Sequence, residues 1–234
     1  MKIAIMQPYF LPYIGYFQLI NAVDKFVIYD DVNFINKGWI NRNNILVNGK
    51  KHLFQIPLRE ASQNKLIKEI YIINDTKWKT NLLKTIEQAY KKSPHYKSVC
   101  EMIHAILLSD KTKIAELNVL SVQMICNYLK IETEIISSSE RYHNKHLKGQ
   151  ERILDICEQE GADTYINPIG GTDLYDTLHF KNKKIELYFI ESISKPYKHN
   201  ANDFIPWLSI VDVMMNNSPD EISEQLNSYQ LIKN

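Results

Sequence analysis

MKIAIMQPYFLPYIGYFQLINAVDKFVIYDD, residues 1–31, decides the fold class of this chain. The apolar runs KIAIM (residues 2–6) and FVIY (residues 26–29) predict two short buried strands, because polar or turn-forming residues bound each of them. Pro8 and Pro12 keep the first half of the intervening segment out of a helix interior, whereas the second half, from Gly15, has helical spacing. The predicted unit is strand, aromatic loop, helix and strand.

Strands and helices alternate along the rest of the chain. The Asn48-Gly49 turn predicts a β-hairpin over residues 40–58, and further strands are expected in residues 68–73, 132–140, 164–171 and 185–191. Helical spacing occurs in residues 78–108, with a break at Ser93-Pro94, and in residues 114–131, 149–161 and 204–216. These patterns predict an α/β fold with a mostly parallel sheet, flanking helices and a hairpin excursion. We expect one unit over residues 1–234, with an inserted helical part at about residues 78–131.

Composition limits the classes of function. The chain has 234 residues and a formal net charge of +1, so it lacks the basic excess of an obligate nucleic-acid partner. Its three cysteines are odd in number and widely spaced, which is typical of a reducing compartment. The sequence shows neither a membrane span nor a signal peptide, and we expect a cytoplasmic protein. It indicates no metal site, and it names neither a cofactor nor an oligomeric state.

The loop after the first strand is the first candidate site. In parallel sheets the ligand lies outside the carboxyl ends of the strands, where the loops into helices converge. Gln7, Tyr9, Tyr13 and Tyr16 offer flat faces with amide or hydroxyl groups to a ring with a polar edge. The alternative is that these side chains only cap the sheet.

The layout of this segment resembles that of nucleotidylyltransferases and pantothenate synthetases, in which a His-x-Gly-His bracket opens the helix. Tyr13, Gly15 and Tyr16 occupy the matching positions here. Tyrosine cannot supply the imidazoles that contact phosphates in those enzymes, so the resemblance implies their topology and a helix N-terminus able to hold an anion, but not their mechanism.

Asp30 and Asp31 end the second predicted strand, at the edge where catalytic carboxylates are commonly placed. Adjacent residues of a strand point to opposite faces, so we expect one of the two to enter the site. That carboxylate could orient a sugar amine or hydroxyl, or act as a general base. The alternative is a cap for the following turn.

Two further segments carry candidate binding residues. Lys37, Trp39, Arg42 and Asn43 combine charges for a phosphate or carboxylate with an indole that can stack on a sugar or base. A solvated hairpin around a core tryptophan would show the same residue types. Ser138 lies in a serine-rich loop whose amides and hydroxyls could bind phosphate oxygens, and the alternative is that its serines simply cap a turn.

The segment TYINPIGGTDLYD (residues 164–176) also follows a strand and should reach the same edge as the first loop. Tyr165, Asn167 and Tyr175 are therefore further candidates for the cleft. The sequence favours neither a catalytic serine nor a catalytic cysteine, because no nucleophile elbow surrounds the serines and the cysteines lie on apolar helical stripes.

Five blocks, in this order, are similar to the WbqC-like family of bacterial proteins: QPYFLPYIGYFQLI, DKFVIYDDVNFINKGWINRNNI, SSSE, GADTYINPIGGTDLY and FIPWLSIVD. This resemblance implies a role in O-antigen, lipopolysaccharide or capsule biosynthesis. It also implies that aminotransferases which make amino sugars are encoded in the same gene clusters. As a hypothesis, it implies transfer of a glycyl or another acyl group to an amino sugar.

Two classes of function follow. The first is a transferase that acts on a nucleotide-linked amino sugar, with an acidic side chain deprotonating the sugar amine, and its partners would be the nucleotide-linked sugar and an acyl donor. The second is a non-catalytic binding or scaffold protein of the glycan pathway. A catalytic site requires Asp30 or Asp31 to converge with Tyr13 and Arg42 on one cleft, whereas a scaffold does not.

Overall fold

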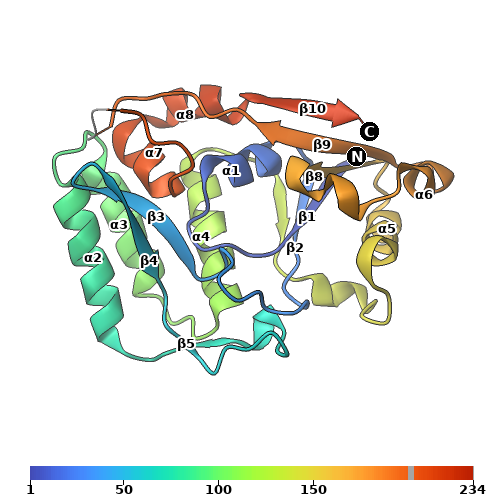
Figure 1. The fold of residues 1–234 in the computed structure, drawn as a ribbon, viewed down its shortest axis with the longest axis horizontal. Helices are drawn as coiled ribbons and strands as arrows, with labels where there is room; N and C mark the ends of the chain where they lie inside the picture. Colours follow the sequence, from blue (N-terminus) through green and yellow to red (C-terminus); the bar gives the residue numbers. More distant parts are fainter. Residues whose placement is uncertain (200–202, 234) are drawn as a thin grey trace.

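The computed structural model describes residues 1–199 and 203–233, and a six-stranded sheet runs through its centre (Figure 1). The sheet has the strand order β10-β9-β8-β1-β2-β7. The bounds of these strands are β1 (Lys2–Met6), β2 (Lys25–Ile28), β7 (Glu134–Ile136), β8 (Thr164–Pro168), β9 (Glu186–Ser192) and β10 (Tyr229–Lys233). Neighbouring strands are parallel except for the antiparallel pair of β9 and β10. The predicted α/β class with a mostly parallel sheet is confirmed.

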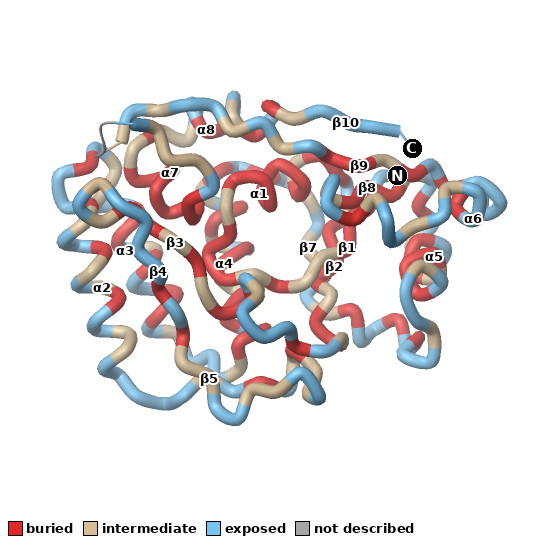
Figure 2. The backbone as a smooth tube through the Cα atoms, viewed as in Figure 1, coloured by how far each residue is buried: buried red, intermediate tan, exposed pale blue. Residues whose placement is uncertain are grey.

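β1 lies in the middle of the sheet, between β8 and β2. Ile3 and Ile5 pack into the core on one face of the sheet, and Ala4 packs into the core on the other. A strand that is covered on both faces reads as a continuous apolar run, which is why KIAIM shows no polar alternation. Figure 2 shows the buried backbone along β1, β8 and the helices packed on them.

Helices cover both faces of the sheet. The helices of the larger core, which includes Ala4, are α1 (Ile14–Asn21), α2 (Thr76–Tyr90), α3 (Tyr96–Leu107), α4 (Ile114–Tyr128), α7 (Ile210–Asn216) and α8 (Pro219–Leu226). The other face carries α5 (Gly149–Glu160) and α6 (Thr177–Asn182). α1 and α4 lead to β2 and β7, whereas α5 and α6 lead back to β8 and β9. The winding therefore reverses between β1 and β8, and ligands bind at such a switch point in doubly wound folds.

The predicted hairpin is confirmed as the pair β3 (Arg42–Val47) and β4 (Lys50–Gln55). Asn48 and Gly49 join its strands with φ angles of 50° and 74°. Two successive residues with positive φ form the tight turn that Asn-Gly favours. The remaining short elements are β5 (Leu58–Arg59), β6 (Tyr71–Ile72) and the 3₁₀ turns η1 (Ile67–Glu69), η2 (Ser139–Tyr142) and η3 (Ile169–Leu174).

The carboxyl-terminal region differs from the prediction. α7 begins at Ile210 rather than at Phe204, because Ser209 caps it by accepting a hydrogen bond from the Val211 amide at 3.3 Å. Trp207, just before this cap, has a φ of 64° and cannot continue a helix. α6, α8 and β10 were not predicted.

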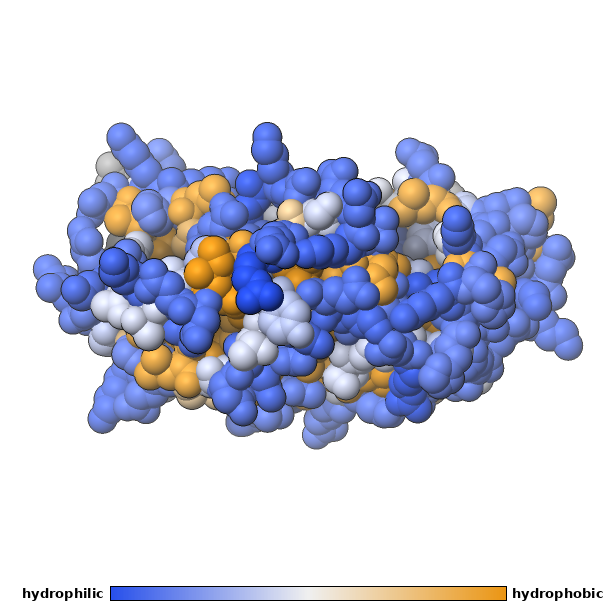
Figure 3. All heavy atoms as spheres, turned by 90° about the horizontal axis from the view of Figure 1, so that it is seen from below, coloured by the Kyte–Doolittle hydropathy of each residue, from blue (hydrophilic) through white to orange (hydrophobic). Residues whose placement is uncertain are grey.

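The surface is mixed in character. Seen from below, hydrophilic side chains surround separate apolar patches (Figure 3). Among residues 1–199 and 203–233, no helix combines the length and the apolar character that a bilayer crossing requires.

Candidate functional site

A cavity of about 510 Å³ lies at the switch point between β1 and β8. Its volume is within the range of small-molecule sites. It is lined by Tyr9, Pro12, Tyr13, Gly15, Trp39, Asn43, Pro168, Ile169, Gly170, Ile190, Glu191, Ser192 and Trp207. We call it the aromatic pocket. It brings together the loop after β1, the loop after β8 and the end of β9, as expected for the carboxyl edge of a parallel sheet.

Tyr13 forms one wall, and Gly15 makes its position possible. A Cβ on Gly15 would overlap the Tyr13 ring, with Cζ only 2.7 Å away, and would also approach Ser192 Oγ to 2.8 Å. The missing side chain therefore lets the ring fold back over the first turn of α1. Burial raises the pKa of Tyr13 and of Tyr9, so both rings are neutral phenols at physiological pH.

Trp207 lines the pocket next to Tyr13. Its ring meets that of Tyr13 edge to face, with centroids 5.7 Å apart. Trp207 is still 45% exposed, and its φ of 64° is unfavourable for a bulky residue. A strained residue held beside a cavity is typical of a functional site.

The loop after β1 is fixed from several sides. Asn43 Nδ2 and Ser209 Oγ both donate to the Leu11 carbonyl, at 2.8 Å and 2.7 Å. Asn118 Nδ2 on α4 donates to the carbonyls of Pro8, at 2.9 Å, and Ile40, at 2.8 Å. Side chains from three distant parts of the sequence therefore hold the loop after β1, and with it the pocket wall, in place.

The first-loop candidates separate into two groups. Tyr9 and Tyr13 line the aromatic pocket. Tyr16 is buried in the core, where its hydroxyl donates to the Gln7 carbonyl at 2.9 Å and burial raises its pKa. Gln7 is half-buried, and its side chain does not line the pocket.

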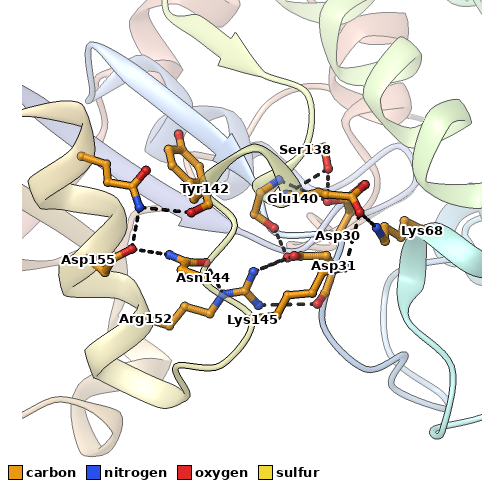
Figure 4. Close-up of polar contacts among 12 residues, drawn as sticks. Asp30, Asp31, Lys68, Ser138, Glu140, Tyr142, Asn144, Lys145, Arg152 and Asp155 are labelled. Atoms are coloured by element: carbon orange, nitrogen blue, oxygen red, sulfur yellow. Dashed lines mark hydrogen bonds and ion pairs between the residues drawn. The ribbon is translucent and has the colours of Figure 1, made fainter.

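Asp31 lies in a buried ion pair (Figure 4). Arg152 Nη2 donates to both carboxylate oxygens of Asp31, at 2.7 Å and 2.6 Å, and Ser139 Oγ donates to Oδ1. The Arg152 guanidinium also lies over the Tyr29 ring, 5.0 Å from its centroid. Asp31 therefore joins β2 to α5.

Asp30 is buried at the wall of a different cavity, a groove of about 720 Å³ at the ends of β2 and β7. Its Oδ1 accepts hydrogen bonds from Ser138 Oγ, at 2.7 Å, and from the Ser139 amide, at 3.2 Å. Burial raises the pKa of Asp30, although the Ser138 bond opposes this effect. Lys68, Lys111 and Lys113 also line the groove, which we call the lysine groove.

The segment from Lys37 to Asn43 divides between the pocket and its rim. Trp39 and Asn43 line the aromatic pocket. The Arg42 guanidinium lies 5.9 Å from the centroid of the Trp39 ring and donates to the carbonyls of Lys37 and Gly38. Lys37 is exposed with a φ of 60°, and neither it nor Arg42 is among the pocket-lining residues.

Tyr165, Asn167 and Tyr175 form a buried cluster beneath the loop after β8. Tyr165 Oη lies 3.1 Å from both Asn167 Oδ1 and Tyr175 Oη. The Asn167 amide packs over Gly171, where a Cβ would overlap it. The cluster supports Ile169 and Gly170, which line the pocket, but its own side chains do not.

The aromatic pocket and the lysine groove are thus separate cavities. Asp30 and Ser138 line the groove, whereas Tyr13 lines the pocket, so the expected convergence on one cleft is absent among the described residues. Within the same part of the chain, no group of three or more His, Cys, Asp or Glu side chains is arranged to hold a metal ion.

Eight of the thirteen lining residues are not among the site candidates, and three of these eight carry polar or aromatic side chains: Glu191, Ser192 and Trp207. Glu191 and Ser192 end β9, so the rule applied to the other strands would have selected them. Trp207 carries no comparable signal, because the spacing of its segment predicts a helix.

The fold defines a doubly wound α/β protein with a cavity at its switch point. The chain belongs to the WbqC-like protein family, whose model matches residues 7–224. It is 29% identical over 219 residues to the uncharacterized protein Rv1507c of Mycobacterium tuberculosis (strain ATCC 25618 / H37Rv), covering 92% of this chain and 93% of that one. No solved structure matches the chain.

Proposed function

We propose that this protein is a transferase of bacterial surface-polysaccharide biosynthesis that modifies a nucleotide-linked amino sugar. The proposed reaction is transfer of an acyl or aminoacyl group to the sugar amine. Membership of the WbqC-like family agrees with the pathway, and the geometry of the two cavities supports the type of substrate.

The aromatic pocket at the switch point carries this proposal. Tyr9, Tyr13, Trp39 and Trp207 surround it with flat apolar faces, on which a sugar ring can stack. Polar groups at its edge, from Glu191 and Ser192, can fix the orientation of the ring. A mainly apolar wall with a few convergent polar groups is the usual composition of a ligand site.

We propose that the phosphates of such a substrate bind in the lysine groove, whose lining combines three lysines with the carboxylates of Asp30, Glu69, Glu116 and Glu140. Lys111 and Lys113 line it beside the first turn of α4, which also presents backbone amides. The ends of β1 and β7 are two strand spacings apart, roughly 10 Å. We propose that the substrate lies along this edge of the sheet, with its sugar in the aromatic pocket and its phosphates toward the groove.

The reaction needs a proton acceptor next to the sugar amine. The amine nitrogen would bond to the acyl carbon, the bond from that carbon to the leaving group would break, and the leaving group would keep the electron pair. Glu191 would take the amine proton, since it is the carboxylate among the described residues that line the aromatic pocket. Asp30, in the groove, is too far along the edge for this role in the same pose.

Calorimetry with a panel of nucleotide-linked amino sugars and their non-amino counterparts tests the proposal. We expect selective binding by the wild type and loss of binding in Tyr13→Ala and Trp39→Ala. Leu178→Ala is the control, because Leu178 is exposed on α6 and lines neither cavity. Absence of binding by the folded wild type would contradict the proposal.

Turnover decides between the two classes of function. Candidate acyl donors are added to the bound sugar, and product is followed by mass spectrometry in the wild type and in Glu191→Gln. Amide formation that Glu191→Gln slows supports the transferase. Tight binding without turnover by any donor would favour the alternative, a non-catalytic protein that presents the sugar to other enzymes.

A further inference from the structure

A buried side chain outside the cavity, Gln18, determines whether the Ser192 hydroxyl on the pocket wall can donate a hydrogen bond to a ligand. Gln18 on α1 is fully buried, and its Nε2 donates to the carbonyls of Gln225, at 2.8 Å, and Ser228, at 2.9 Å. These two acceptors fix the orientation of the amide, so Gln18 Oε1 must accept. The hydroxyl of Ser192 donates to it.

This bond uses the only proton of Ser192 Oγ. A hydroxyl has one donor and two acceptor lone pairs, so Ser192 can offer only an acceptor to the pocket. Asn43 is not restricted in this way, because one N–H of its Nδ2 donates to the Leu11 carbonyl at 2.8 Å and the second stays available to the pocket, while its Oδ1 accepts from the Asn44 amide at 2.8 Å.

The charges of the lining residues have one sign. Among the described residues around the cavity, Glu191 is acidic and none is Lys, Arg or His. Arg42, whose guanidinium lies 5.9 Å from the centroid of the Trp39 ring, donates to the carbonyls of Lys37 and Gly38 and does not line the cavity. The neutral rings of Tyr9, Tyr13, Trp39 and Trp207 add the negative potential of their π faces.

We infer that the aromatic pocket is a site for an organic ammonium group, held by ring faces, the Glu191 carboxylate and the acceptor lone pairs of Ser192. Acceptors, a carboxylate and π faces all favour a cationic donor and disfavour an anion. The inference deepens the proposed function and rests on it for the sugar: the protonated amine enters the aromatic pocket, and the phosphates stay outside it. Gln18 acts as a positioning residue for this selectivity.

Matched probes of equal shape test the inference without a nucleotide or a sugar. Cyclohexylamine, which is protonated at neutral pH, and cyclohexanol differ mainly in charge. Trp39 and Trp207 report binding by fluorescence in a Trp78→Phe background, which removes the tryptophan that lies outside the pocket. We expect cyclohexylamine to bind about tenfold more tightly than cyclohexanol.

Two variants separate the contributions of charge and hydrogen bonding. Glu191→Gln should remove most of the preference for the amine while leaving cyclohexanol binding unchanged. Ser192→Ala should weaken binding of cyclohexylamine severalfold but not that of its N,N,N-trimethyl derivative, which has no N–H to donate. Equal affinity of the wild type for cyclohexylamine and cyclohexanol, or tighter binding of cyclohexanecarboxylate, would overturn the inference.

The results that would contradict the ammonium site differ from those that would contradict the proposed function. Selective amine binding together with no binding of any nucleotide-linked amino sugar would leave the ammonium site standing and remove the proposed substrate. Binding of nucleotide-linked sugars that is indifferent to the amino group would support a sugar site and contradict the ammonium site.

Discussion

The adjacent carboxylates of Asp30 and Asp31 differ in the groups that compensate their charge. Asp31 is fully buried against Arg152, with a shortest nitrogen–oxygen distance of 2.6 Å. Asp30 is buried beside a cavity, and its carboxylate accepts from neutral donors only among the described residues. Removing one partner of a buried ion pair leaves an uncompensated charge, whereas replacing Asp30 by its amide removes a poorly solvated charge.

We therefore expect Asp31→Asn to lower the free energy of unfolding by about 3–5 kcal/mol. Asp30→Asn, the matched control one residue away, should change it by no more than about 1 kcal/mol. Urea unfolding followed by circular dichroism measures both. An Asp31→Asn variant as stable as Asp30→Asn would show that the Asp31–Arg152 pair does not stabilise the fold.

The pKa of Asp30 gives a pH dependence of known sign. Burial raises this pKa in the folded protein above the unfolded value of about 3.9. The folded state then binds the proton more tightly, so the free energy of unfolding falls as pH rises from about 3.9 through the raised folded pKa.

As pH rises from about 3.9 through the raised pKa of Asp30, the free energy of unfolding of the wild type should fall relative to that of Asp30→Asn. Urea unfolding of both proteins between pH 3.5 and pH 8 measures the difference. A difference that stays constant, or that changes in favour of the wild type as pH rises, would contradict a raised pKa.

At the scale of elements, the strand and helix patterns were predictable where the chain is strongly apolar. β1, β2, β8 and β9 are covered by helices on both faces, and their apolar runs predict them directly. α8 and β10 are short and polar, so periodicity alone does not show them. A capping box formed by Ser218 and Glu221 marks the start of α8 and could have been used.

The first turn of α1 supplies a prediction about the pocket wall. Alanine at Gly15 would improve helix propensity by about 1 kcal/mol, but its Cβ would push the Tyr13 ring away. We expect Gly15→Ala to fold with near-normal stability and to lose ligand binding at least tenfold, measured with cyclohexylamine by fluorescence.

Gly170→Ala is the matched control for that variant. Gly170 lines the same pocket, and a Cβ there would meet no atom within 4 Å. Its binding should equal that of the wild type. If both glycine variants bind equally well, the position of the Tyr13 ring does not define the pocket.

At the scale of the whole molecule, the site could be predicted in part. The carboxyl-edge rule selects the loops after β1 and β8, and Tyr9, Tyr13, Trp39 and Asn43 do line one cavity. The sequence could not show that the loops after β2 and β7 form a separate groove, because that depends on the strand order. It also could not show that Asp31 meets Arg152, which lies 121 residues away.

Asn118 on α4 tests whether the loops around the pocket depend on hydrogen bonds from that helix. Its Nδ2 joins the Pro8 and Ile40 carbonyls, and it is fully buried. Asn118→Ala leaves both acceptors unsatisfied, so we expect a loss of about 2–4 kcal/mol in the free energy of unfolding and a shift of the tryptophan emission. Asn81→Ala, on the exposed side of α2, should stay within about 0.5 kcal/mol of the wild type.

The contacts of Gln18 have a consequence for protein synthesis. A ribosome makes α1 early, but the carbonyls that orient Gln18 belong to residues 225 and 228, and β1 must wait for β8 at residues 164–168. At about 5–20 residues per second, the nascent chain passes tens of seconds between making the first wall of the pocket and making the groups that set its polarity. A chain stalled before residue 228 would carry most of the cavity without the groups that set its proposed selectivity, so that selectivity is acquired only after residue 228 has been made.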